Sequence, residues 1–191
     1  MARTPDRQLK ERILDVAQAL LRTQGEKGLT IRAVADAAGT TTPTIYKRFP
    51  NKESMLVALA LRERERYVTR MVQRRSLESA VTGYLDWAAQ HPHEYQLIYG
   101  HHWPQVFSEE TGRPGLEWTK QKLASRHGGQ PEDYVLITSA LWLLLHGAAS
   151  LLTQHPEGQG SDRVREDCIA ACSKLLEEAP KFRRKPGPKD N

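Results

Sequence analysis

The sequence predicts an all-α protein with a helix-turn-helix head and a larger helical body, with about nine helices in total. Three observations predict this fold class. Apolar residues recur at helical spacing along the chain, and no segment shows convincing strand-like alternation. Glycine and proline divide the 191 residues into segments of helix length. Residues 30–49, TIRAVADAAGTTTPTIYKRF, fit two short helices joined by a glycine turn.

The first helix is expected to begin near Thr4-Pro5, a capping residue followed by proline at the first helical position. It runs to about Thr23 and ends before Gly25. Its apolar residues fall on one face: Leu9, Ile13, Val16, Ala17, Leu20 and Leu21.

The next two helices form the predicted helix-turn-helix. Thr30 and Thr41 are placed to cap them, and Gly39 supplies the conformational freedom that ends the first. Ile45 and Phe49, four residues apart, face the core and leave the polar residues of the second helix on its other side. Such a helix fits a DNA major groove, which is about 12 Å wide. The alternative is an αα-hairpin with no role in DNA binding.

A fourth helix is predicted after Asn51, and residues 53–75 are interpreted as the connection between head and body. Its first apolar positions, Met55 to Ala60, are expected to pack on the head. The arginine-rich part that follows, from Arg62 to Arg75, is interpreted as a solvated face. The head is therefore assigned to residues 1–52.

The body is assigned to residues 76–180 and the basic tail, expected to be disordered, to residues 181–191. Proline and glycine separate its predicted helices. These cover about 77–90, a segment after His91-Pro92, about 116–126, 134–152 and 161–178. The stretch 100–115 has the least regular pattern.

Residues 134–152 form the most apolar segment of the chain. Its nineteen residues are nearly enough to span a bilayer, but four polar side chains interrupt it and it is the only such segment. A helix that is apolar all round is normally buried on all sides. We therefore expect it to pack on its own core and on a second subunit, with an interface formed by Ala148, Leu151, Val164, Cys168, Cys172 and Leu175.

The charge distribution and the cysteine content are typical of a cytoplasmic protein that binds nucleic acid. Residues 1–52 contain ten Lys and Arg against five Asp and Glu, whereas residues 53–180 contain thirteen against seventeen. The N-terminus has no secretory signal pattern, and the two cysteines form no C-x-x-C motif or disulfide framework. The cysteines lie on one helical stripe and are interpreted as small buried hydrophobes.

The helix-turn-helix residues resemble a known family. Ala38-Gly39, Thr41, Pro43-Thr44-Ile45-Tyr46, Phe49 and Asn51-Lys52-Glu53 are similar to the signature of the TetR family of bacterial transcriptional regulators, over roughly the first 60 residues. Thr40 departs from the usual valine, and Pro43 stands where glycine is common. The resemblance implies a repressor that binds a palindromic operator as a dimer and is released by a small molecule.

The same resemblance assigns roles within the head. Positions facing bases or the adjoining backbone are Arg32, Thr42, Pro43, Thr44 and Tyr46, and positions that hold phosphates are Thr30, Thr41, Lys47 and Lys52. In the C-terminal half, Trp142, His146 and Gly147 resemble the Trp…His-Gly motif of one subgroup of TetR C-terminal domains.

Aromatic residues of the body, some of which carry a polar atom, are typical of the lining of an apolar effector pocket. The candidates are Trp87, Tyr95, Tyr99, Trp103, Trp118, Trp142 and His146. A metal-sensing regulator is a less favoured alternative, based on His91, His93, His101 and His102. We expect no cofactor and no catalysis, because phosphate-loop, nucleophile-elbow and H-E-x-x-H motifs are missing. We expect no resident metal because these histidines lie beside a proline-broken loop with no cysteine near it. A nucleic-acid-binding protein without sequence choice is the main alternative function.

Overall fold

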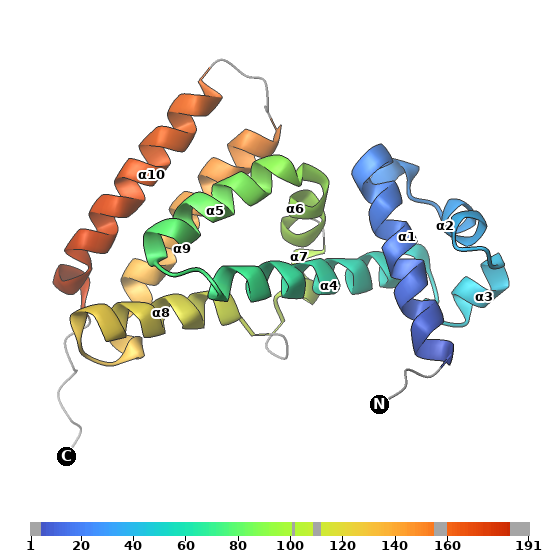
Figure 1. The fold of residues 1–191 in the computed structure, drawn as a ribbon, viewed down its shortest axis with the longest axis horizontal. Coiled ribbons are helices and arrows are strands. Elements are labelled where there is room, and N and C mark those ends of the chain that lie inside the picture. The colour runs from blue at the N-terminus through green and yellow to red at the C-terminus, as the bar shows by residue number, and fades with distance from the viewer. Residues whose placement is uncertain (1–4, 101, 109–111, 155–159, 184–191) are drawn as a thin grey trace. The chain divides into compact units, whose positions relative to one another are not determined.

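The computed structural model describes residues 5–100, 102–108, 112–154 and 160–183, and every regular element in those ranges is a helix (Figure 1). The all-α prediction is confirmed. The helices form two compact units, each made of two separate stretches of the chain. The first unit comprises Met1–Arg66 and His91–Thr111, and the second comprises Tyr67–Gln90 and Gly112–Asn191.

The first unit contains the predicted helix-turn-helix. Its elements are α1 (Pro5–Gly28), α2 (Ile31–Ala37), α3 (Thr42–Tyr46), most of α4 (Lys52–Val72), α6 (Pro92–Tyr99) and α7 (Trp103–Val106). Asn51 caps the start of α4, because its Oδ1 accepts a hydrogen bond from the Ser54 amide at 2.7 Å. Buried apolar side chains from α1, α2, α3 and α4 form its core, among them Ile13, Leu21, Val34, Ile45, Met55 and Leu59.

One helix of this unit was not predicted. The described ranges contain ten α-helices against about nine expected, and the additional one is α7. It occupies four residues of the stretch 100–115, where proline and glycine obscure helical periodicity. A single turn this short has no periodicity to detect, so the sequence could not reveal it.

Gly25 marks the point where the regular first helix ends. Its φ of +66° and ψ of −175° lie outside the helical region, although the helical assignment continues to Gly28. Side chains rarely adopt this φ, so glycine is the residue suited to the position. The predicted end of the helix at Gly25 is therefore correct in backbone terms.

The second unit is built around α9. Its elements are the end of α4, α5 (Leu77–Gln90), α8 (Pro114–His127), η1 (Pro131–Tyr134), α9 (Val135–Gln154), α10 (Ser161–Glu178) and η2 (Ala179–Phe182). Helix α9 packs against α5, α8 and α10. The observed bounds of α5 and α10 coincide with those predicted. Tyr134 is fully buried and its hydroxyl donates to the carbonyl of Gly128 at 2.7 Å, which ties the start of α9 to the end of α8.

Helix α9 is only partly covered by its own chain. The helical segment Pro131–Gln154 is long and apolar enough to cross a bilayer by length and composition, but a single such helix is weak evidence for a membrane protein. Only 33% of its most apolar stretch is buried, whereas a core helix would be mostly buried. Its large exposed side chains are Val135, Leu136, Leu143 and Leu151.

Three of the predicted interface residues are covered by their own chain. Ala148, Cys168 and Cys172 are buried within the second unit. The Sγ atom of Cys168 lies 3.8 Å from the backbone oxygen of Leu144, because this stripe of α10 faces α9 of the same chain. Their side chains are therefore covered without a partner subunit. Leu151 is exposed, and Val164 and Leu175 are half-buried.

Candidate nucleic-acid interface

Two capped helices and a glycine turn build the helix-turn-helix. Thr30 is the N-cap of α2, and its side-chain oxygen accepts a hydrogen bond from the Ala33 amide at 3.1 Å. The chain then reverses at Gly39, whose φ is +61°. A Cβ at this position would meet no atom within 4 Å, so the requirement for glycine comes from the backbone conformation rather than from crowding.

Helix α3 is short and is fixed at both ends. Its N-cap is Thr41, which accepts from the Thr44 amide, and the two threonine hydroxyls lie 2.9 Å apart. At the other end the Arg48 guanidinium donates to the carbonyl of Thr44 at 3.1 Å. Ile45 and Phe49 are buried and anchor α3 to the core of the unit. The position of its outer side chains is thus set by caps and core together.

The predicted DNA-facing residues come to the surface. Tyr46 is 52% exposed, and Pro43, Thr41 and Lys47 are exposed as well. Thr42 and Thr44 are half-buried, and Thr30 is exposed. Arg32 is exposed on α2, where it lies 4.0 Å from the Asp36 carboxylate one turn later. An exposed ion pair of this kind is weak, so Arg32 can exchange Asp36 for another acceptor.

Lys52 differs from the other predicted phosphate ligands because it has a structural partner. Its ammonium group donates to the backbone oxygen of Glu26 at 2.9 Å, and the side chain is half-buried. This bond ties the first residue of α4 to the end of α1. Lys47 is exposed and is the better test of a phosphate contact.

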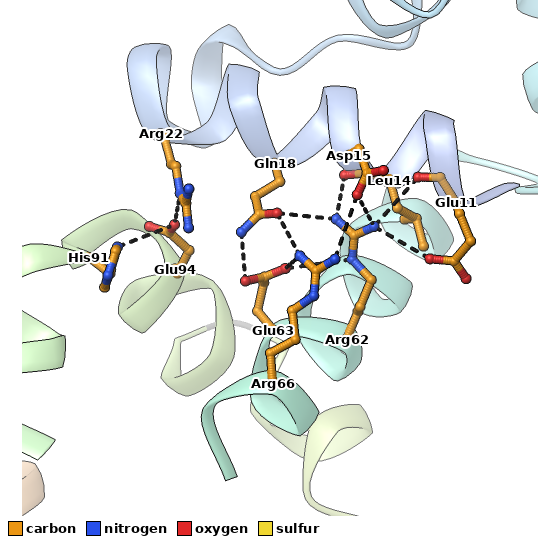
Figure 2. Close-up of polar contacts among 10 residues, drawn as sticks. All are labelled: Glu11, Leu14, Asp15, Gln18, Arg22, Arg62, Glu63, Arg66, His91 and Glu94. Atoms are coloured by element: carbon orange, nitrogen blue, oxygen red, sulfur yellow. Dashed lines mark hydrogen bonds and ion pairs between the residues drawn. The ribbon is translucent and has the colours of Figure 1, made fainter. Parts of the chain in front are cut away.

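A polar cluster with a buried centre and exposed edges joins α1 to α4 (Figure 2). We call the cluster the polar seam, and it consists of Glu11, Asp15, Gln18, Arg62, Glu63 and Arg66. Gln18 is at its centre: its amide nitrogen donates to Glu63 at 2.7 Å, and its oxygen accepts from Arg62 and Arg66. Arg62 also donates to the carbonyl of Leu14 at 2.7 Å.

A second buried carboxylate joins α1 to α6. Glu94 is almost fully buried, forms an ion pair with Arg22 of α1 and lies 3.7 Å from Nδ1 of His91 (Figure 2). A buried carboxylate needs a charged or hydrogen-bonded partner to offset its lost hydration, and Arg22 is such a partner. Helix α6 is therefore fastened to α1, the helix that precedes the helix-turn-helix.

The arginine-rich part of α4, from Arg62 to Arg75, was interpreted as a solvated face. This interpretation was wrong for the first turn of that part. Glu63 is 3% exposed and Arg64 is 8% exposed. The Arg64 guanidinium lies 4.7 Å from the centroid of the Phe107 ring, and burial lowers the pKa of Arg64 below its usual value. A signal was present: Gln18 falls on the apolar stripe of α1, and Glu63 follows the buried Leu59 by four residues.

His102 is another functional candidate that spacing alone did not place. Its side chain is almost fully buried, with Nδ1 2.8 Å from a carboxylate oxygen of Glu53 and Nε2 3.9 Å from Glu26. It links the segment before α7 to the end of α1 and the start of α4. His101 lies outside the described residues. Among the residues that the structure describes, no three His, Cys, Asp or Glu side chains converge as in a metal site.

The predicted ligand-binding residues are divided between the two units. Tyr95 and Tyr99 belong to the first unit, where their rings lie 4.9 Å apart. Trp87, Trp118, Trp142 and His146 belong to the second unit, and the side chain of Trp103 lies outside the described part. Trp87 packs on two aromatic residues that the sequence analysis did not select, Tyr67 and Tyr84, with ring centroids 4.4 and 6.5 Å away.

Trp142 and His146 form a stacked pair one turn apart on α9. Their rings are 5.1 Å apart and nearly parallel, at 7°. Burial lowers the pKa of His146 below its ordinary value of 6.5. The imidazole is therefore neutral at pH 7, a state in which it can both donate and accept a hydrogen bond.

This shift predicts a pH dependence of stability. Below the ordinary pKa of about 6.5 the unfolded chain binds more protons at His146 than the folded chain does, so acidification favours unfolding. We expect the free energy of unfolding to fall more steeply between about pH 7 and about pH 5 in the wild type than in His146→Phe, which keeps a stacking ring. Urea denaturation at several pH values measures the difference, and equal slopes would contradict the assignment.

Comparison with known proteins covers both halves of the chain. Residues 13–59 match the family model of bacterial regulatory proteins, tetR family, and residues 77–171 match the model of a tetracyclin repressor-like, C-terminal domain. An uncharacterized HTH-type transcriptional regulator in the dhlA 5'region of Xanthobacter autotrophicus is 44% identical over 63 residues, which are 33% of this chain and 31% of that protein. The repressor KstR of Rhodococcus jostii is 39% identical over 61 residues, 32% of this chain and 29% of KstR. The chain thus spans about a third of the length of the curated relatives it matches.

Solved structures share the fold over nearly the whole chain. A TetR variant from Acinetobacter baumannii AYE in complex with minocycline superposes with a TM-score of 0.68 at 18% identity, covering 91% of this chain and 97% of that one. The regulator SCO7222 from Streptomyces coelicolor gives a TM-score of 0.65 at 23% identity, covering 92% and 99%. At these identities the likeness concerns the fold.

Proposed function

The chain belongs to the TetR family of bacterial regulatory proteins, and on that premise we propose that it is a DNA-binding transcriptional repressor released by a small molecule. The observation that carries the proposal is the doubly capped α3, which presents Tyr46 and Lys47 outward while Ile45 holds it to the core. A rigid short helix with a polar outer face is what major-groove recognition requires. The name of the KstR relatives, transcriptional repressor, favours repression over activation.

The experiment that tests this function separates sequence-specific binding from general attraction to nucleic acid. DNA fragments recovered by the purified protein are sequenced, and the enriched site and a scrambled duplex are titrated at several salt concentrations. We expect the enriched site to bind at least ~10³-fold more tightly at physiological salt. Equal affinity for both duplexes at every salt concentration would favour the alternative, a basic protein that binds without sequence choice.

Two exposed residues of the head should affect binding in different ways. Arg32→Ala is expected to cost about 1–3 kcal/mol on the preferred site and little on scrambled DNA, because a base contact is lost. Lys47→Ala is expected to weaken binding to both duplexes and to reduce the salt slope by about 1, because a phosphate contact is lost. Fluorescence anisotropy with both duplexes measures the two patterns, and an identical pattern for both variants would refute these roles.

The exposed stripe of α9 supports the proposed homodimer. Leu136, Leu143, Gly147 and Leu151 are all exposed in one chain and recur at intervals of seven, four and four residues. That spacing places them on one face of the helix. A Cβ at Gly147 would meet no atom within 4 Å, so its surface is open for the close approach of another helix. We assign the dimer seam to this stripe, in place of the buried Ala148, Cys168 and Cys172.

The effector is proposed to bind in the second unit, as an apolar or aromatic molecule with few polar groups. The buried rings of Tyr67, Tyr84 and Trp87 and the Trp142–His146 stack supply surface of matching chemistry. Helix α4 is the proposed coupling element, because residues up to Arg66 cluster with the first unit and those from Tyr67 with the second. Release requires the effector to favour the arrangement that does not bind DNA, and such coupling is typically about 1–3 kcal/mol.

A further inference from the structure

The inner face of α1 carries a charge where its apolar stripe would continue. Leu14, Ala17 and Leu21 are buried and follow one another at intervals of three and four residues, which places them on one face of the helix. Lys10 precedes Leu14 by four residues and belongs to the same face, yet it is exposed. The first turns of α1 therefore extend past the core of the first unit, with a lysine at the position that would face the core.

Lys10 lies against the residue that anchors the end of α3. Its Nζ is 5.8 Å from the centroid of the Phe49 ring, and Phe49 is buried and follows Tyr46, the last residue of α3, by three positions. Attraction to the π face and burial of the aliphatic stem hold a lysine over such a ring. The contact orients the ammonium group but leaves its positive charge in place.

Arg7 extends this basic face by one turn. It precedes Lys10 by three residues, so the two side chains are neighbours on the helix surface, and both are exposed. Neither forms an ion pair with another described residue, and the adjacent carboxylate of Glu11 lies 3.7 Å from Arg62 instead. Like charges at this spacing repel each other, and a bound anion would remove the repulsion.

We propose that Lys10 and Arg7 bind the phosphate backbone of DNA beside the groove that receives α3. This binding depends on the proposed function, because it requires α3 to enter the major groove. That groove is about 12 Å wide, so the phosphates on its edges lie about 6 Å from the axis of a helix at its centre. A cation held at the end of α3 is therefore close to one edge. These two residues add α1 to the phosphate contacts predicted for Thr30, Thr41, Lys47 and Lys52.

A phosphate contact from α1 fixes the orientation of the helix-turn-helix rather than its choice of bases. Contacts to phosphates carry no direct sequence information, but they set the register and orientation of a protein on the duplex. Contacts from two helices of one unit restrain a rotation about the axis of α3 that contacts from α3 alone would allow. Loss of Lys10 or Arg7 should therefore weaken binding to every duplex by the same factor and leave the preference between duplexes unchanged.

Three variants, each lacking one positive charge of α1, test this role. Lys10→Gln and Arg7→Gln remove the proposed contacts. Arg12→Gln is the matched control, because Arg12 is also exposed but follows Lys10 by two residues and so lies on the opposite side of the helix. Fluorescence anisotropy with the enriched and the scrambled duplex, between about 50 and about 200 mM salt, measures affinity. We expect Lys10→Gln and Arg7→Gln each to lower the slope of log affinity against log salt by about 0.9, and Arg12→Gln to leave it unchanged.

A neutral backbone position locates the contact on the DNA. Methylphosphonate groups, which carry no charge, replace the phosphates of the enriched duplex one at a time. We expect at least one position at which the replacement weakens binding of the wild type but does not weaken binding of Lys10→Gln further, because one contact cannot be lost twice.

Equal losses of slope in Lys10→Gln and Arg12→Gln would overturn the proposed contact, because net charge alone would then account for them. An unchanged slope in Lys10→Gln would overturn it as well, and so would methylphosphonate effects that are all independent of Lys10. Failure of the proposed function gives a different result. The wild type would then bind the enriched and the scrambled duplex with equal affinity, whatever the slopes of the variants.

Discussion

Leu143→Glu is expected to convert a dimer into a folded monomer. In one chain Leu143 is 61% exposed, so the glutamate is solvated and the fold of the protomer is unaffected. In the proposed seam the same carboxylate would be buried without a partner, and burial of an unpaired charge is strongly unfavourable. We expect the dissociation constant of the dimer to rise at least about a hundredfold, which sedimentation velocity across a concentration series would measure.

A matched control carries the same charge at an exposed position on another helix. Gln121→Glu on α8 should leave the oligomeric state unchanged. If both variants sediment as the wild type does, the exposed stripe of α9 is not the interface. A wild-type protein that is monomeric at micromolar concentration would refute the dimer itself.

A dimer carries two recognition helices to DNA. Two recognition helices on one dimer should meet half-sites about 34–36 Å apart, or a multiple of this spacing, so the operator should be palindromic. Leu143→Glu should then bind a single half-site as the wild type does, but lose its preference for the full palindrome. An unchanged preference for the palindrome in a monomeric variant would contradict the proposed mode of binding.

Glu63→Ala is expected to lower the free energy of unfolding by about 1–3 kcal/mol, the range for leaving a buried hydrogen-bond donor without its acceptor. The carboxylate of Glu63 accepts from Gln18 at 2.7 Å and from Arg66 at 3.0 Å. Without it the buried Gln18 amide loses its acceptor and the arginines lose a counter-charge. Urea denaturation followed by circular dichroism measures the change.

Glu65→Ala is the control for this prediction. Glu65 lies on the same helix but is exposed, so its removal should change the free energy of unfolding by no more than about 0.5 kcal/mol. Glu63→Gln should fall between the two, because it keeps an acceptor for Gln18 but removes the charge. If Glu63→Ala and Glu65→Ala have equal stability, the polar seam does not hold α1 to α4.

The sequence by itself determined the local structure of the head. A cap at Thr30, a glycine at Gly39 and a second cap at Thr41 act within four residues along the chain, so their effect can be inferred without knowing the rest of the fold. The bounds of α5 and α10 were predicted for the same reason, since helical periodicity and chain breakers are local signals.

Only the tertiary structure decided which polar residues are buried and which apolar residues are exposed. Gln18 and Glu63 are 45 residues apart, and polar residues of this kind are expected to be solvated when the sequence is considered alone. Only the fold brings the two side chains together and buries them. The stripe of α10 that includes Cys168 was expected in a dimer seam, but it packs on α9 of the same chain and leaves Leu143 uncovered instead. Periodicity shows that a helix has an apolar face, but the partner of that face depends on elements distant in sequence. Burial is therefore a property of the assembled fold, whereas capping is a property of the local chain.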